Sequence, residues 1–154
     1  DVFLDNDHSL IGVESKFLEY LTPKKGIFSE TYNRGNLPEL EEACWHLIDH
    51  IKELPKQHLD ATQLVKHYIG MSNLSFEKEK EKNLLYLFWE PENWKDFDIF
   101  KRHRSEIKDF ASYFDKLSVK FIYQSYPELW DDWEQHYKNT SHVSELRERY
   151  YLSI

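Results

Sequence analysis

Two apolar segments at the start of the chain predict a β-hairpin. DVFL (residues 1–4) and LIGVESKF (residues 10–17) are separated by Asn6–Ser9, a cluster of residues that favour turns. If these four residues form the loop, Asp5 pairs with Leu10 across the hairpin. Side chains then alternate between the two faces of each strand.

The rest of the chain predicts helices around two further strands. Apolar residues that recur at steps of three and four predict helices at 37–54, 59–70, 94–117, 127–133 and 143–151, with a short helical turn at 28–34. Gly70 is expected to end the second helix. LLYLFWE (84–90) is typical of a central strand covered on both faces, and VKFIYQS (119–125) predicts another strand. These elements predict an α/β fold in which a small mixed central β-sheet is flanked by α-helices on both faces.

Length and composition are those of a packed protein. The 154 residues are 40% hydrophobic and 16% aromatic, which suffices for one sizeable core, so we expect a single domain over residues 1–154. The one cysteine, Cys44, cannot form an internal disulfide, and no apolar run is long enough to span a membrane. We therefore expect a cytoplasmic protein with no membrane partner. Because the chain begins at Asp1 without a methionine, we also expect the natural protein to extend further upstream.

The net charge disfavours one broad class of nucleic-acid-binding protein. A formal charge of −8 does not suit a protein that coats nucleic acid nonspecifically, because such binding neutralises many phosphates with Lys and Arg. A local basic groove is compatible with this net charge. Carboxylates that surround a divalent cation would also contribute to the negative net charge.

Glu14 and Lys16 place two charges inside a strand, where charge is usually excluded. They share one face, while Ile11 and Val13 share the other, which we expect to be the core face. Counting outward from the loop, Asp1 falls directly opposite Glu14, with Cβ atoms about 5 Å apart. Two carboxylates that close repel each other unless a cation lies between them, and either Lys16 or a divalent metal could be that cation.

Mg²⁺ is the metal that such a pair suits best. It prefers one or two carboxylates and keeps several waters for phosphate oxygens, whereas Zn²⁺ prefers nitrogen and sulfur ligands. Lys16 would then face the water that the metal activates. Zinc is disfavoured further because His46 and His50 are the only histidines four residues apart, and no glutamate of a metalloprotease motif stands between them.

These residues resemble the signature of the PD-(D/E)xK, or restriction-endonuclease-like, nuclease superfamily. That signature is an Asp on one strand and, roughly a dozen residues later, an (Asp/Glu)-x-Lys on the paired strand, which Asp1 and Glu14-Ser15-Lys16 match. Further segments read like one little-characterised bacterial branch of the superfamily: IGVESKFLEYLTPKK, ATQLVKHYIG, LYLFWEP, FKRHRSEIKDF and SYPELWDDW. The resemblance covers most of the chain. It implies a restriction-endonuclease-like core and hydrolysis of phosphodiester bonds in DNA.

Carried over to this sequence, the resemblance implies roles for five residues. Asp1 and Glu14 would be metal ligands, with the backbone carbonyl of Ser15 as an extra ligand, for Mg²⁺ or for Mn²⁺ as a substitute. Lys16 would orient the attacking water or stabilise the charged phosphorus transition state. Gln63 resembles a glutamine that some branches place beside this lysine. Many nucleases with this core cut duplexes as dimers, so the resemblance is compatible with a homodimer, and the sequence leaves the oligomeric state open.

Two parts of the family pattern would lie before the first residue. They are the proline that precedes the Asp and, in many members, a glutamate on an upstream helix. A second class of function therefore stays open, in which the chain keeps the nuclease fold but acts without catalysis as a binding or scaffolding module. The net acidity is consistent with this alternative.

The remaining polar candidates are five residues that could simply be solvated. Lys24, Lys25 and Arg34 could grip phosphates near the site, although basic loop residues are usually solvated. Lys66 and His67 fit the solvated side of an amphipathic helix.

Overall fold

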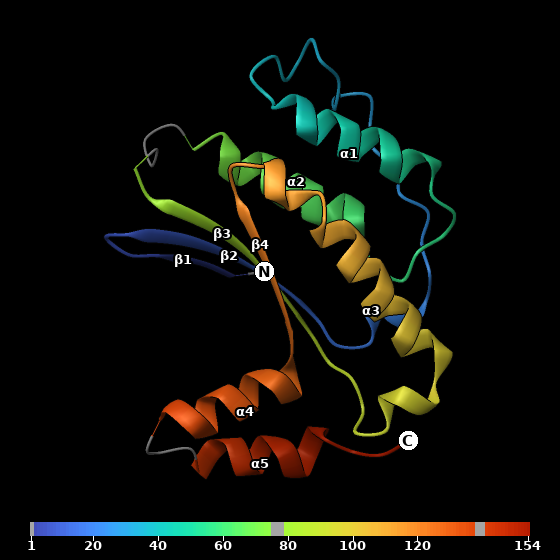
Figure 1. The fold of residues 1–154 in the computed structure, drawn as a ribbon, viewed down its shortest axis with the longest axis vertical. Helices are drawn as coiled ribbons and strands as arrows, with labels where there is room; N and C mark the ends of the chain where they lie inside the picture. The colour runs from blue at the N-terminus through green and yellow to red at the C-terminus, as the bar shows by residue number, and fades with distance from the viewer. Residues whose placement is uncertain (1, 75–78, 138–140) are drawn as a thin grey trace.

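The computed structural model describes residues 2–74, 79–137 and 141–154, and these contain a four-stranded sheet. The strands stand in the order β1 (Val2–Asp5), β2 (Ser9–Lys16), β3 (Glu81–Phe88) and β4 (Lys120–Ser125). β1 pairs antiparallel with β2, whereas β2, β3 and β4 are mutually parallel, so the sheet is mixed as predicted (Figure 1). Parallel neighbours need crossover connections, which here are helical.

The hairpin has the predicted register. Asp5 pairs with Leu10, and Val2 pairs with Val13 at the other end of β1. The side-chain oxygen of Asn6 closes the turn by accepting hydrogen bonds from the backbone N–H groups of His8 and Ser9, both at 2.9 Å. Asp1, which the prediction places opposite Glu14, lies outside the described residues.

The helices of the described chain surround this sheet. They are α1 (Glu42–Glu53), α2 (Ala61–Ser72), α3 (Asp98–Ala111), α4 (Tyr126–His136) and α5 (Ser141–Tyr150), with short 3₁₀ turns η1 (Glu19–Leu21), η3 (Trp94–Asp96) and η4 (Phe114–Lys116). α1 and α2 connect β2 to β3, and α3 connects β3 to β4. The described chain therefore contains two strand–helix–strand crossovers.

The first helix begins later than the apolar pattern predicts. It starts at Glu42 and not at Leu37, and Glu41 directly before it has a non-helical backbone (φ −55°, ψ 139°). The helical turn expected at 28–34 is also absent from the structure, which has separate hydrogen-bonded turns there, such as the one from the carbonyl of Ser29 to the N–H of Tyr32.

α2 begins and ends at identifiable residues. The side chain of Asp60 caps its N-terminus by accepting a hydrogen bond from the N–H of Gln63 at 3.1 Å. The helix passes Gly70, where we expected it to stop, and ends at Ser72. Gly70 does not adopt the left-handed conformation with which a glycine ends a helix.

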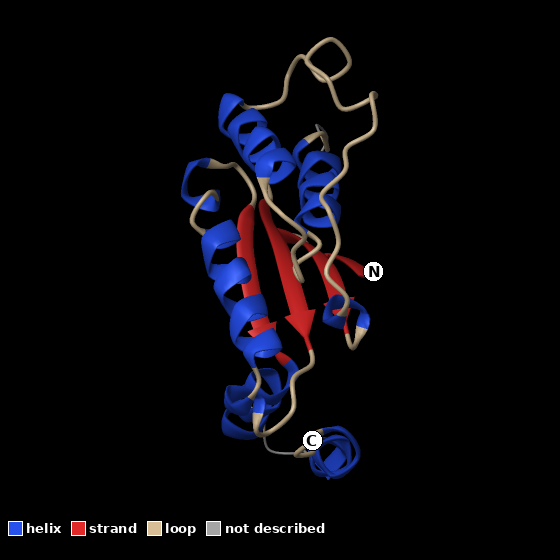
Figure 2. Cartoon of the chain, turned by 90° about the vertical axis from the view of Figure 1, so that its right-hand side faces the viewer, coloured by secondary structure: helices blue, strands red, loops and turns tan. Residues whose placement is uncertain are grey.

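One face of the sheet carries the core. Leu84, Tyr86 and Phe88 alternate along β3 on this face and are at most 1% exposed. They pack in one cluster with buried side chains of α1, α2 and α3. Figure 1 shows these three helices on the same side of the strands, and Figure 2 shows α3 running beside the sheet.

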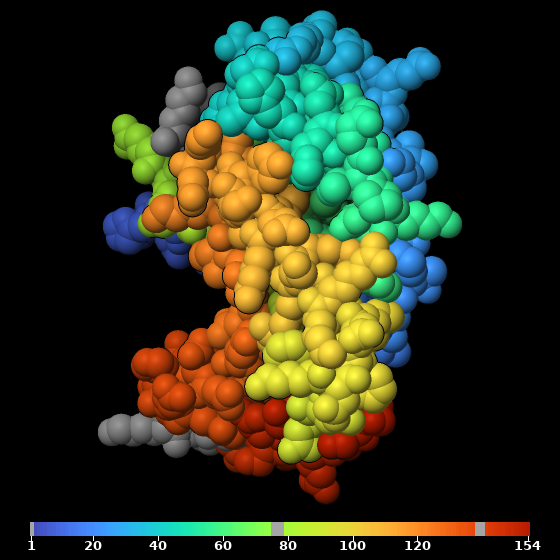
Figure 3. Space-filling view, turned by 45° about the vertical axis from the view of Figure 1, so that its right-hand side comes forward, coloured from blue at the N-terminus to red at the C-terminus, as the bar shows by residue number. Residues whose placement is uncertain are grey.

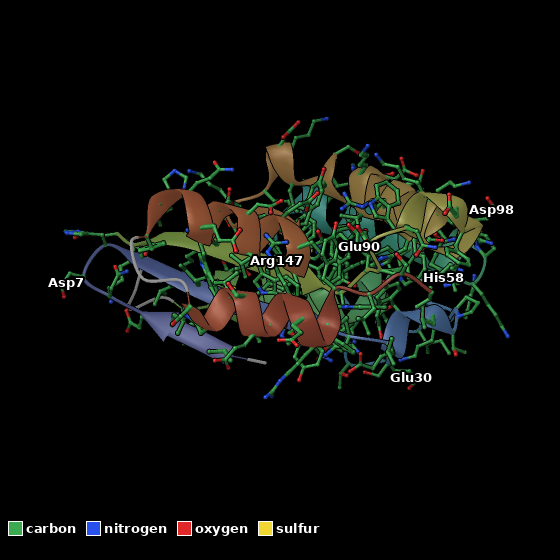
Figure 4. The ribbon with its side chains drawn as sticks, turned by 90° about the horizontal axis from the view of Figure 1, so that it is seen from below. Asp7, Glu30, His58, Glu90, Asp98 and Arg147 are labelled. Carbon is green, nitrogen blue, oxygen red and sulfur yellow. The ribbon has the colours of Figure 1, made fainter. Side chains whose placement is uncertain are left out.

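The opposite face is covered at its end by α4 and α5. The hydroxyl of Tyr126 in α4 lies 2.6 Å from Oγ of Ser15, and Asp132 accepts a hydrogen bond from Gln124. Arg147 of α5 pairs with carboxylates of α4, so the two helices lie side by side across the strand ends (Figure 4).

Farther from α4, this face is open. Val2, Leu4 and Ile122 are 55%, 51% and 46% exposed. The space-filling view shows a hollow in the surface between α4 and α3 (Figure 3). The predicted α/β fold is confirmed and is consistent with a restriction-endonuclease-like core, but the helices flank the two faces of the sheet unequally.

Glu90, two residues after the end of β3, carries a buried charge that Arg104 of α3 neutralises. Its side chain is 4% exposed, and Arg104 of α3 donates hydrogen bonds to both of its oxygens. Arg104 also donates to Glu128 of α4 at 2.9 Å and lies over the rings of Phe88 and Trp94. One guanidinium group therefore ties the end of β3 to both α3 and α4.

Replacing Arg104 with alanine should lower the free energy of unfolding by about 3–5 kcal/mol, because Glu90 would stay buried without its charge partner. Urea denaturation measures this loss. The matched control is Lys101→Ala on the same helix, which removes an exposed pair with Asp98 and should cost less than about 1 kcal/mol. Equal losses in the two variants would contradict the role given to Arg104.

Candidate active site

α2 lies against the face of β2 that carries Glu14. Gly12 on the same face permits this close approach, because a Cβ there would lie 2.8 Å from Sδ of Met71 in α2. Glu14 is 1% exposed, whereas Ile11 and Val13 on the other face are only half-buried. The expectation that Ile11 and Val13 face the core was therefore wrong, since α2 packs on the side that carries the charge.

Two nitrogen atoms hold the buried carboxylate of Glu14. Nζ of Lys16 lies 2.6 Å from Oε1, and Nε2 of His67 lies 2.9 Å from Oε2. Burial alone would raise the pKa of Glu14, but the hydrogen bond with His67 and the nearby charge of Lys16 outweigh it, and the pKa lies below its ordinary value of 4.5. Because an ionised carboxylate can only accept, Nε2 of His67 carries a proton and donates it.

The spacing of strand and helix explains how four residues meet here. Glu14 and Lys16 stand two residues apart on β2, a rise of about 6.6 Å. Gln63 and His67 stand four apart on α2, a rise of about 6 Å. α2 runs opposite to β2, so His67 meets Glu14 while Gln63 accepts a hydrogen bond from Nζ of Lys16 at 3.0 Å.

Gln63 thus lies beside Lys16, as the family resemblance implies. His67 was not among the expected site residues, because its polar character fits the solvated side of a helix equally well. The signal that could have identified it is its place one helical turn after Gln63, which puts both residues on the same face of α2.

The side chains of Ser15 and of the basic loop residues do not contact Glu14. The side chain of Ser15 points to the opposite face of the sheet, where it meets α4. Lys25 donates to two backbone carbonyls at the end of α1, and Arg34 forms a two-point pair with Glu42 at 2.6 and 2.7 Å. Lys24 is 58% exposed and lies near the start of α2. All three basic loop residues therefore have partners within the chain, and the partner of Lys24 is Oδ2 of Asp60 at 3.8 Å.

The site is more open on the side of His67 than on the side of Lys16. A cavity of about 290 Å³ lies between α2 and the hairpin, with Phe3, Lys66 and His67 in its lining. The cavity beside Lys16 measures only about 10 Å³. The side chain of His67 is 32% exposed and that of Lys16 is 15% exposed. Solvent therefore reaches this group of residues mainly past His67.

The donors around Glu14 fit a hard divalent cation in part. Oε1 of Glu14 makes no hydrogen bond of good geometry within the described chain and meets Lys16 only as an ion pair. A carboxylate offers about four lone-pair positions, and Lys16 and His67 take two of them, so oxygen donors of the kind that Mg²⁺ prefers remain. Yet residues 2–74, 79–137 and 141–154 contain no group of three or more His, Cys, Asp or Glu side chains that could hold a metal. The second carboxylate of the prediction, Asp1, lies outside these ranges.

Comparison with models of known families adds one match. Residues 1–151 match the family described as Restriction Endonuclease associating with ARP. The chain belongs to this family. No curated protein and no solved structure matches the chain.

Membership of the family confirms the resemblance drawn from the sequence, and it covers nearly the whole chain. It implies a DNA nuclease, which hydrolyses phosphodiester bonds. Within the ranges that the structure describes, no helix has the length and apolar character needed to cross a membrane.

Replacing Glu14 with glutamine should flatten the loss of stability in acid. Because the folded-state pKa of Glu14 lies below 4.5, its ionised carboxylate stabilises the fold fully above pH 4.5, and that contribution is lost as the pH falls through the folded-state value. In this window the group contributes a slope of up to about 1.4 kcal/mol per pH unit, which the variant lacks. Urea unfolding at a series of acidic pH values gives both slopes, and parallel curves would contradict the assignment.

Proposed function

We propose that this chain is a Mg²⁺-dependent DNA endonuclease of the PD-(D/E)xK type, with Mn²⁺ as a possible substitute metal. In this proposal Asp1, Glu14 and the backbone carbonyl of Ser15 hold the metal, while Lys16 and Gln63 complete the site. The observation that carries it is the ammonium of Lys16, 2.6 Å from the buried carboxylate of Glu14 and 3.0 Å from Gln63, in a chain of a restriction endonuclease family.

Each of these side chains has a physical task. Glu14 supplies an ionised oxygen donor on a rigid strand, and its burial prevents water from competing for that oxygen. Nζ of Lys16 lies beside Glu14, and Gln63 fixes its orientation by accepting one of its hydrogen bonds. Such an amine can orient the attacking water or stabilise negative charge that develops on the phosphoryl oxygens. A divalent cation, when bound, activates a water molecule and neutralises phosphate charge.

DNA binding by this chain must be local, because the overall charge is −8. Few phosphates can then be neutralised, so the affinity for DNA should depend only weakly on salt. Lys24, exposed near the start of α2, is a candidate for one such contact. A homodimer, which would double the number of contacts, stays a prediction.

The alternative is a protein with the nuclease fold that binds or scaffolds without hydrolysis. One observation favours it: both oxygens of Glu14 already face a nitrogen. A plasmid-nicking assay separates hydrolysis from binding without hydrolysis.

The test is nicking of supercoiled plasmid by the purified protein with Mg²⁺ or Mn²⁺, and with a chelator as the blank. Lys16→Ala should lower the rate about 100- to 1000-fold, because it removes one charge-stabilising donor. Lys120→Ala, which loses only an exposed pair with Glu81 on the strand edge, should cut at the wild-type rate. Circular dichroism confirms that each variant is folded. No metal-dependent nicking by the wild-type protein would favour the scaffolding function.

A further inference from the structure

We propose that His67 is a positioning residue of this site, which holds the Glu14 carboxylate in the orientation that a metal ion requires. The inference rests on the proposed function, because it assigns Glu14 as a metal ligand. Neither the family match nor the signature motif assigns a role to His67.

The contact between His67 and Glu14 is direct and shielded from water. Nε2 of His67 donates to Oε2 of Glu14 at 2.9 Å, and the carboxylate is 1% exposed. Oε1 faces Lys16 on the other side. A glutamate side chain has three rotatable bonds. Contact with a single nitrogen would therefore leave the carboxylate free to rotate about its last carbon–carbon bond. The second anchor, from His67, fixes the plane of both oxygens.

The anchor comes from a helix that cannot shift easily. Buried side chains hold α2 against the sheet, among them Leu64, Val65 and Tyr68, each at most 1% exposed. The side chain of Asp60 fixes the first turn. A donor carried by such an element is preorganised, because its position is determined by the packing of the core before any ligand arrives.

His67 also stands between Glu14 and solvent. Its ring lines the cavity of about 290 Å³ between α2 and the hairpin, while Glu14 behind it is almost fully buried. Each carboxylate oxygen has a second lone pair, so the hydrogen bond from His67 leaves Oε2 able to bind a cation. Partners that hold a metal ligand in this way typically change the affinity for the metal about 10- to 100-fold when they are removed.

The test compares two amides of different reach. In His67→Gln the side-chain amide can donate from nearly the position of Nε2, whereas in His67→Asn the amide is one carbon–carbon bond shorter and falls short of Oε2. Binding of Mn²⁺ to the metal-free protein, without DNA, is measured by titration calorimetry. We expect His67→Asn to raise the dissociation constant about 10- to 100-fold and His67→Gln to restore most of the affinity.

Two further variants complete the design. His46→Asn makes the same substitution on the exposed side of α1, where the histidine side chain is 72% exposed, and should bind Mn²⁺ like the wild type. His67→Leu is close in size and has no donor, so it should bind as weakly as His67→Asn and replaces it if that variant does not fold. In plasmid nicking, the loss should appear in kcat at a given metal concentration and not in KM for DNA.

The outcomes distinguish this inference from the proposed function. Unchanged Mn²⁺ affinity in His67→Asn and His67→Leu, with normal binding by the wild type, would overturn the role of His67 and leave the nuclease proposal intact. Equal weakening in His67→Gln and His67→Asn would also overturn it, since hydrogen-bond reach would then be irrelevant. Absence of Mn²⁺ binding by the wild type would overturn the metal-dependent function itself.

Discussion

The carboxylate of Glu14 is buried away from water, and the packing of α2 on β2 supplies the polar partners that a buried charge requires. Transfer of a carboxylate into a protein interior costs several kcal/mol unless partners replace its hydration. Lys16 replaces it from the same strand, and His67 replaces it from the facing helix. Gly12 permits the approach by leaving room for Met71. Without this contact between strand and helix, neither the ammonium nor the imidazole would have a defined position.

A second buried charge plays a comparable part just after the C-terminal end of β3. Glu90 and Arg104 are paired at a point where the chain leaves the sheet, and the same guanidinium reaches Glu128 of α4. The core helices and the α4–α5 pair are thereby joined through one side chain. The strand ends, where β2 also finishes, are thus held by charge pairing and by aromatic rings, such as that of Phe17 against Trp89.

Much of the fold could be predicted from the sequence, because it depends on local signals. The turn at Asn6 gave the hairpin register, and the apolar run in β3 gave a central strand. The start of α1 could not be predicted from its apolar residues alone. The amphipathic pattern begins at Leu37, whereas the helical backbone begins only at Glu42. The covered face of β2 was also misjudged, because alternation shows that two faces differ but not which one a helix will cover.

For the site, the motif Glu14-Ser15-Lys16 and its neighbour Gln63 could be named from sequence because they match a family pattern. His67 could not, because a polar residue on an amphipathic helix has no local mark that separates a buried contact from a solvated one. Its partner is 53 residues away along the chain. Only the packing of α2 on β2 brings the two together.

The geometric match between α2 and β2 also limits how the chain can change in length. Each helical residue turns the following side chains by about 100° around the axis. An inserted residue in the exposed loop around Gly35, before α1, lies outside this match and can be absorbed at little cost. The same insertion between Gln63 and His67 would rotate one of the two away from the strand while the other stayed. Length variation among related chains should therefore fall outside this single turn of helix.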